Sequence, residues 1–232
     1  TIEVVDMSNL WITLSPMIIG SAVVPVQIII TILLLRSPSG RLAAVGWVTG
    51  MATLRVLQGI VFGLILHSGR NRGPGSEHHG YILPTVLLIL AGLMYVVAVR
   101  ELLNAPDEDA PPPKWMTIAD SLTPQRAFLL GFGLLLIEPK FWIFTLGAIA
   151  AIGEADLGRP LAIGMFLVFV LLASIIQLVL IGITYCAPRR AESVLTVLSD
   201  QLSKYSRSIM IVLGLVFGTW FLIKALHGLG II

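Results

Sequence analysis

Near the middle of the chain, a glutamate, a proline and a lysine interrupt an apolar run that is long enough to cross a bilayer. Within residues 127–152 the only charged side chains are Glu138 and Lys140, one on each side of Pro139. A charge at the centre of a membrane costs on the order of 3 kcal/mol, so such residues usually face the interior of a helix bundle. Because proline has no N–H to donate to the carbonyl of Leu135, we expect the helix to break here. A charged, broken helix inside a membrane is typical of transporters.

The composition indicates a membrane protein. Hydrophobic residues make up 56% of the chain, charged residues make up 12%, and the mean hydropathy is +0.94, outside the usual range of soluble domains. A net charge of +2, without a basic stripe interleaved with aromatic residues, argues against nucleic-acid binding. The single cysteine, Cys186, excludes an intrachain disulfide and a multi-thiolate metal site, and is expected to be a packing residue.

Six apolar segments reach the length of about 20 residues that a membrane-spanning helix needs. They cover residues 10–35, 42–67, 81–100, 127–152, 160–186 and 208–226. The first segment is too long for the core of a signal peptide, so we expect it to remain as a helix. We therefore predict an all-α membrane protein, a single transmembrane domain over residues 1–232 with six transmembrane helices. A connection rich in proline and acidic residues, about 101–126, would separate two sets of three helices, about 10–100 and 127–228.

The lysines and arginines of the loops predict the orientation in the membrane. One side would carry Arg36, Arg41, Arg100, Lys114, Arg126, Arg189, Arg190, Lys204 and Arg207, and the other Arg70, Arg72 and Arg159, with Lys224 near the last helix end. The first side is expected to be cytoplasmic. Both termini would then lie outside.

The two halves share features at corresponding positions. The first helix of each half carries a proline near mid-depth, Pro25 or Pro139, and the second carries an amide, Gln58 or Gln177. With three helices per half, the second half enters from the opposite side, which predicts two inverted repeats with proline-broken helices 1 and 4. Paired broken helices point to a site near the middle of the membrane, and Gln27 lies beside the first break. A kink with only local structural value is the alternative for Pro25.

Arg55 lies near the centre of the second apolar segment, with Gln58 one helical turn further along the same face. In one hypothesis Arg55 meets an anionic group of a substrate, with Gln58 beside it. In the other, Arg55 forms a structural ion pair with Glu138. The two are compatible, since a substrate anion could compete for the arginine, and both are more favourable than an arginine that faces lipid.

Glu138 and Lys140 leave several roles open. Glu138 could couple transport to protons, be the permanent partner of Arg55 or Lys140, or bind a cation. Lys140 could contact a substrate anion or extend along an aqueous cavity.

The remaining motifs have simple structural explanations. Residues 189–207 place apolar side chains on roughly one helical face, which predicts an amphipathic helix at the cytoplasmic interface, either as a plain connector or with a role in lipid handling. Those side chains are Val194, Leu195, Val197, Leu198, Leu202 and Tyr205. Three glycine pairs predict close helix packing within the chain, with a homodimer seam as the alternative: Gly46 and Gly50, Gly59 and Gly63, Gly214 and Gly218.

The motifs of enzymes and cofactor-binding proteins are missing from the sequence. His78 and His79, with Glu77, lack defined metal-ligand geometry, so a solvated loop is expected and no metal site. There is no phosphate-binding loop and no convincing catalytic triad or dyad. We expect neither enzyme activity nor a cofactor.

Six helices in two inverted triplets, a proline-broken first helix and a Pro-Lys in the fourth resemble the lysine-exporter superfamily. Residues 11–41 (WITLSPMIIGSAVVPVQIIITILLLRSPSGR) are similar to one branch of it, the mycobacterial glycopeptidolipid- and sulfolipid-1-addressing proteins. The resemblance covers essentially the whole chain. Its most specific parts are VVPVQ, SPSGR, Thr53-Leu54-Arg55 with Gln58, and Glu138-Pro139-Lys140.

This resemblance implies export or translocation of a cell-envelope glycolipid across a bacterial inner membrane. Amino-acid exporters of the superfamily tend to carry asparagine where this chain has Glu138, and the chain lacks the acidic pairs of the divalent-cation branches. Both departures argue against a small solute. The leading hypothesis is therefore a lipid transporter whose path is lined by Arg55, Gln58, Glu138, Lys140, Gln27 and Gln177.

Two alternatives remain, a proton-coupled exporter of a small solute (an amino acid or a metal cation) and a non-transporting scaffold for lipid-synthesis enzymes. The expected partners are an envelope glycolipid or another amphipathic anion, membrane lipids, and lipid-synthesis enzymes or other transport proteins. A lateral opening would favour lipid, a small closed cavity a small solute, and a dry, salt-bridged centre the scaffold.

Overall fold

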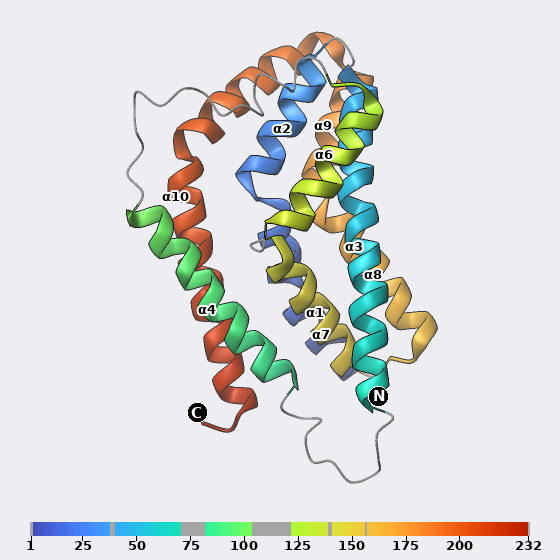
Figure 1. Ribbon diagram of the computed structural model, residues 1–232, viewed down its shortest axis with the longest axis vertical. Helices are drawn as coiled ribbons and strands as arrows, with labels where there is room; N and C mark the ends of the chain where they lie inside the picture. Colours follow the sequence, from blue (N-terminus) through green and yellow to red (C-terminus); the bar gives the residue numbers. More distant parts are fainter. Residues whose placement is uncertain are drawn as a thin grey trace.

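The computed structural model describes residues 2–37, 40–70, 82–103, 122–138, 141–155 and 157–231, and within these ranges the regular secondary structure is helical throughout (Figure 1). The helices are α1 (Ile2–Ala22), α2 (Pro25–Arg36), α3 (Gly40–Arg70), α4 (Ile82–Leu103), α6 (Pro124–Ile137), α7 (Trp142–Glu154), α8 (Arg159–Ala173), α9 (Ile175–Cys186) and α10 (Pro188–Gly228). Pro139, Lys140, most of the predicted linker and the loop with His78 and His79 lie outside the described residues.

Prolines start several of these helices. Pro25, Pro124, Pro160 and Pro188 lie at the first or second position of α2, α6, α8 and α10. A proline fits there because the first N–H groups of a helix have no partner inside the helix and the proline φ angle is already helical.

Three helices, α3, α4 and α10, are long and apolar enough to cross a membrane. Three pairs, α1 with α2, α6 with α7, and α8 with α9, pass the same test together but bend by more than 40° at a short break. The described residues thus contain three candidate spans, or six if each bent pair is one span. This confirms the all-helical prediction and is compatible with a multi-pass membrane protein. The inverted-repeat arrangement stays a prediction.

Two of the three breaks lie at the predicted prolines. The chain bends by 49° between α1 and α2, directly before Pro25, and α6 ends just before Pro139. The third break, a bend of 57° at Ser174 between α8 and α9, is not predicted by the sequence, because no proline lies there. The corresponding helix of the first half, α3, is continuous, so the two halves differ at this position.

Close helix packing uses the predicted glycines. Gly46 and Gly50 of α3 lie against the backbone carbonyls of Pro124 and Phe128 in α6, so a Cβ atom at either glycine would collide with that backbone. In the same way, Gly214 of α10 lies against α4. Packing within the chain is thus confirmed for these glycines, whereas a Cβ at Gly63 would meet none of the described residues.

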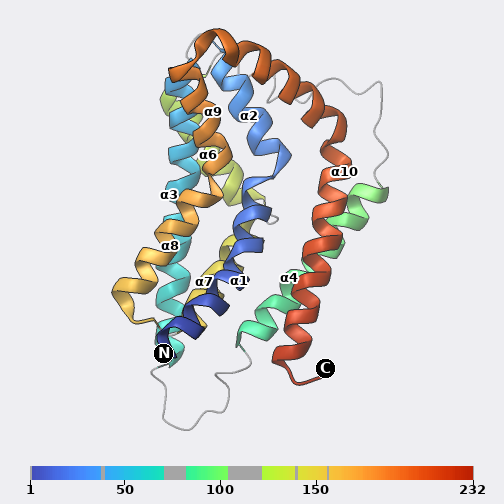
Figure 2. The same ribbon diagram turned by 180° about the vertical axis from the view of Figure 1, so that it is seen from behind.

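Helix α10 continues without interruption from the predicted amphipathic segment into the last span. Its first part lies across one end of the bundle and the rest runs back alongside α4 (Figures 1 and 2). Leu195 and Leu202 are buried against α2 and α9, but Val194, Val197 and Tyr205 are exposed. The prediction of one apolar face is therefore only partly right. The side chains that pack on the end of the bundle form a narrower stripe than predicted.

Polar contacts fix α10 to the end of α4. Arg207 donates hydrogen bonds from Nε and Nη2 to the carbonyl oxygens of Glu101 (2.7 Å) and Leu102 (3.0 Å). These carbonyls belong to the last turn of α4, where a cation is favoured by both the free acceptors and the helix dipole.

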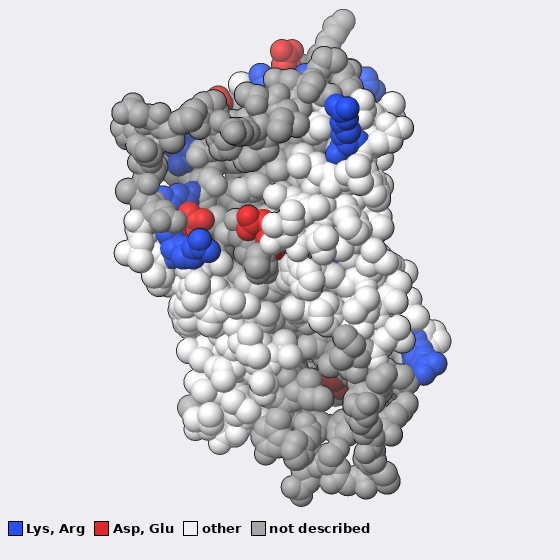
Figure 3. All heavy atoms as spheres, in the orientation of Figure 1, with Lys and Arg blue, Asp and Glu red and all other residues white. Residues whose placement is uncertain are grey.

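Both chain termini lie at the same end of the bundle, opposite the first part of α10 (Figures 1 and 2). On the face shown in Figure 3, most described charged side chains lie in the half away from the termini. This distribution agrees with the predicted grouping of basic residues, while the side of the membrane on which each end lies stays a prediction. Cys186, expected to be a packing residue, is instead exposed, because it is the last residue of α9.

Candidate functional site

A group of polar side chains is buried inside the apolar bundle. The residues of this polar centre are Ser21, Gln27, Arg55, Gln58, Ser174 and Gln177, with relative exposures of 2%, 1%, 1%, 4%, 3% and 0%. Four of them, Gln27, Arg55, Gln58 and Gln177, are predicted path residues. The buried apolar residues form three clusters.

The guanidinium of Arg55 joins two helix breaks. Its Nη2 donates to Oγ of Ser21 (2.9 Å), next to the last residue of α1, and its Nη1 donates to Oγ of Ser174 (3.0 Å), the residue between α8 and α9. Ser174 in turn donates to the carbonyl oxygen of Val170 (3.2 Å). The side chain of Arg55 thus connects the end of α1 to the break between α8 and α9, two segments that are far apart in the sequence.

The partners of Arg55 in the described part of the chain are hydroxyl groups. Its Nε has no hydrogen-bond partner there. The ion pair of Arg55 with Glu138 stays a prediction. Glu138 lies at the C-terminal end of α6 and is partly exposed. A buried cation is costly unless an anion or well-placed acceptors balance it, and Ser21 and Ser174 supply neutral acceptors to Arg55.

Two predicted amides meet at the starts of two helices. Nε2 of Gln177, in the first turn of α9, donates to Oε1 of Gln27, in the first turn of α2, at 3.4 Å. Oε1 of Gln177, and both Oε1 and Nε2 of Gln58, have no hydrogen-bond partner among the described residues. Since buried polar groups are nearly always hydrogen-bonded, these three atoms are available to hydrogen-bond a ligand.

The break before Pro139 frees a carbonyl that finds a new partner. The indole Nε1 of Trp142 donates to the carbonyl oxygen of Leu135 at 2.8 Å. This confirms the prediction that the Leu135 carbonyl is released from the helix. The partner, Trp142, is a residue that the sequence reasoning missed, because an indole seven residues away reaches the carbonyl only once the helix has bent.

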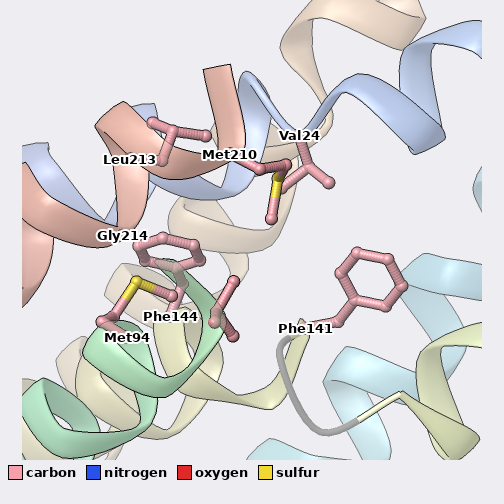
Figure 4. Close-up of a pocket in the computed structure, with 8 residues that line it drawn as sticks. Val24, Met94, Phe141, Phe144, Met210, Leu213 and Gly214 are labelled. Carbon is pink, nitrogen blue, oxygen red and sulfur yellow. The ribbon is translucent and has the colours of Figure 1, made fainter. Parts of the chain in front are cut away.

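A wholly apolar hollow lies beside the same two proline breaks. It is lined by Val24, Met94, Val97, Phe141, Phe144, Met210, Leu213 and Gly214 (Figure 4). Val24 directly precedes Pro25 and Phe141 begins the segment after the second break, while the other side is formed by α4 and α10. The volume of this hollow is about 10 Å³, room for about one water molecule, so it is a small packing gap between these helices.

Some predicted features are not placed by the structure. Pro139 and Lys140 lie outside the described residues, so the roles expected for Lys140 stay predictions. Among the described residues, no group of three or more His, Cys, Asp or Glu side chains could hold a metal ion. Ser21 and Ser174 are visible in the sequence as small polar residues inside apolar runs, but nothing there indicates that both meet Arg55.

Comparison with known proteins gives one match. A family model described as Sap, sulfolipid-1-addressing protein, matches residues 14–227. No curated protein and no solved structure matches the chain. The matched range contains the whole polar centre and the residues that line the apolar hollow.

Proposed function

Since the chain belongs to the sulfolipid-1-addressing protein family, we propose that it moves an envelope glycolipid, or the polar head of one, across the membrane. The apolar helices and the family support a membrane protein tied to lipid addressing. Transport itself, the bacterial inner membrane and the outside position of both termini are parts of the proposal. The path would be lined by Arg55, Gln58, Glu138, Lys140, Gln27 and Gln177.

One observation carries the proposal. A group of buried polar side chains with unpartnered amide atoms lies inside a bundle of apolar helices that are long enough to span a membrane. The head of a lipid is polar and its chains are apolar, so such a centre suits the head, while the apolar helix surfaces suit the chains. The family favours a lipid over a small polar solute, and a scaffold would need no unpartnered buried amides.

The experiment compares lipids extracted from the cell surface with total lipids, in cells with and without the protein. We expect one lipid to be made in normal amount but to be missing from the surface when the protein is absent. If the total amount of that lipid falls by the same factor as its surface amount, the protein acts in synthesis and the scaffold alternative is favoured.

Lys140 gives a second test of the path, which rests on its position after Pro139. Lys140→Met should keep the expression level and melting temperature close to those of the unaltered protein while lowering surface delivery. Lys140→Glu should be inactive, because its charge would repel an anionic head group. Full delivery by a well-folded Lys140→Glu protein would exclude this role.

A further inference from the structure

The positive charge of Arg55 lies inside the bundle, where the guanidinium donates to two neutral hydroxyls. Ser21 and Ser174 occupy two of the five N–H donors of a guanidinium, so three remain, including the one on Nε. At 1% exposure these donors are shielded from solvent. The guanidinium therefore has both the charge and the unused donors that an anion requires.

Two helix ends add to this positive charge. α2 and α9 are each 12 residues long, and each has its N-terminus at the polar centre. Ser174, which holds Arg55, is the N-cap of α9, and the contact between Gln27 and Gln177 brings the first turns of α2 and α9 together. A helix N-terminus carries a partial positive charge and favours anions, so a cation beside it is unfavourable unless an anion is also present.

Gln58 supplies a second, independent indication of a ligand. It lies one turn beyond Arg55 on the same face of α3, where side chains three residues apart are about 5–6 Å apart at Cβ. It is 4% exposed, and neither atom of its amide has a partner among the described residues. An amide in this position can donate its N–H groups to an anion that Arg55 holds.

We propose that the polar centre binds the oxyanion group (a sulfate, phosphate or carboxylate) of the lipid head, held by Arg55 and Gln58 beside the N-termini of α2 and α9. The proposal rests on the proposed function, because it takes the oxyanion to be part of the transported lipid. Ser21 and Ser174 are positioning residues that keep the guanidinium at the two helix breaks.

The test measures thermal unfolding of the purified protein in nanodiscs of neutral phosphatidylcholine. The probes are hexadecyl sulfate, hexadecyl phosphate, the uncharged hexadecanol, and inorganic sodium sulfate at the same concentration. We expect the two charged alkyl probes to raise the melting temperature by a few degrees, because a ligand that binds only the folded state stabilises it. Hexadecanol and sodium sulfate should have no effect at this concentration. An equal shift with hexadecanol would overturn the anion site, and an equal shift with sodium sulfate would overturn the assignment to a lipid head.

Gln58→Leu gives the sharpest variant for this test. The amide makes no hydrogen bond among the described residues, so its replacement by an apolar side chain of similar size should leave the melting temperature without probe unchanged or higher. The shift caused by hexadecyl sulfate should nevertheless become smaller. A purely structural role for Gln58 predicts the full shift, and that result would contradict the site.

Two further variants locate the effect. Arg55→Lys keeps the charge but not the flat fork of donors, so the shift should be lost. Lys224→Met removes a positive charge elsewhere in the bundle and should keep the full shift. If the anion-specific shift is absent while surface delivery of the lipid still depends on the protein, the oxyanion site is wrong and the proposed function stands.

Discussion

Arg55 and Lys224 are both cations inside apolar helices, but their surroundings differ. Lys224 of α10 is half-buried, donates a hydrogen bond to Oγ1 of Thr13, and lies 5.3 Å from the centre of the Trp220 ring. The carboxylate of Glu154, at the end of α7, attracts it. Arg55 is fully buried and its partners among the described residues are two neutral hydroxyls.

The difference separates a structural cation from one that can serve a ligand. Lys224 has a nearby carboxylate, a hydroxyl and an aromatic ring face, so the fold itself accounts for its charge. Arg55 instead donates to two neutral serine hydroxyls in the described part of the chain. A buried cation that only neutral groups contact is a candidate for a functional site.

Reciprocal exchange of the two side chains has the largest expected effect. Arg55→Lys should lower the surface amount of the lipid by about tenfold or more, because lysine cannot contact Ser21, Ser174 and an anion with one planar group. Lys224→Arg should leave delivery unchanged, since it keeps the charge beside Glu154. Lipid analysis at matched protein levels measures both. Equal losses in the two variants would end the distinction between the cations.

Loss of a contact that only stabilises the fold should lower stability without lowering lipid delivery. Trp142→Phe removes the donor to the Leu135 carbonyl and should lower the free energy of unfolding by about 1–3 kcal/mol. Delivery per folded molecule should stay close to normal. Trp11→Phe, at a side chain that is 36% exposed, is the control and should cost less. Denaturant titration in detergent measures the difference, and no loss for Trp142→Phe would mean that the carbonyl is satisfied in another way.

Removal of the structural cation should have a small effect. Lys224→Met should lower the free energy of unfolding by less than about 1 kcal/mol, because the interactions of a half-buried charge are partly screened by solvent. Ile223→Met, next to it and 48% exposed, controls for the new side chain. Thermal unfolding measures the effect, and a loss of several kcal/mol would show that Lys224 is as critical as Arg55.

The smallest expected effect is the coupling between Arg55 and Glu138. Because Arg55 donates to serines, the losses caused by Arg55→Gln and Glu138→Gln should add in the double variant to within about 0.5 kcal/mol. Unfolding of the two single variants and the double variant completes the cycle. A double variant clearly more stable than this sum would restore the ion-pair hypothesis and give Arg55 an internal counter-charge.

The three helix breaks differ in how well they can be predicted from the sequence. Pro25 and Pro139 can be recognised in the sequence, since proline removes a backbone donor wherever it lies. The break at Ser174 depends on the bond of its hydroxyl to the Val170 carbonyl, which bends helices, and on the hydrogen bond from Arg55. The second contact cannot be inferred from residues 160–186 alone, because Arg55 comes from α3.

The contacts within the polar centre can likewise be predicted from the sequence only in part. Arg55, Gln58, Gln27 and Gln177 are polar residues in apolar runs, so their burial near one another follows from the cost of exposing them to lipid. Their actual partners do not follow. Ser21, Ser174 and Trp142 become partners only through helix bends and crossings, which are set by packing of the whole bundle.

The most direct measurement is the ratio of surface to total lipid in cells that carry only Arg55→Gln or only Lys224→Met, at equal protein levels. We expect Arg55→Gln to lower this ratio to that of cells without the protein, while total lipid stays constant and Lys224→Met keeps the normal ratio. A normal ratio with Arg55→Gln would contradict the claim that this buried cation serves the transported lipid.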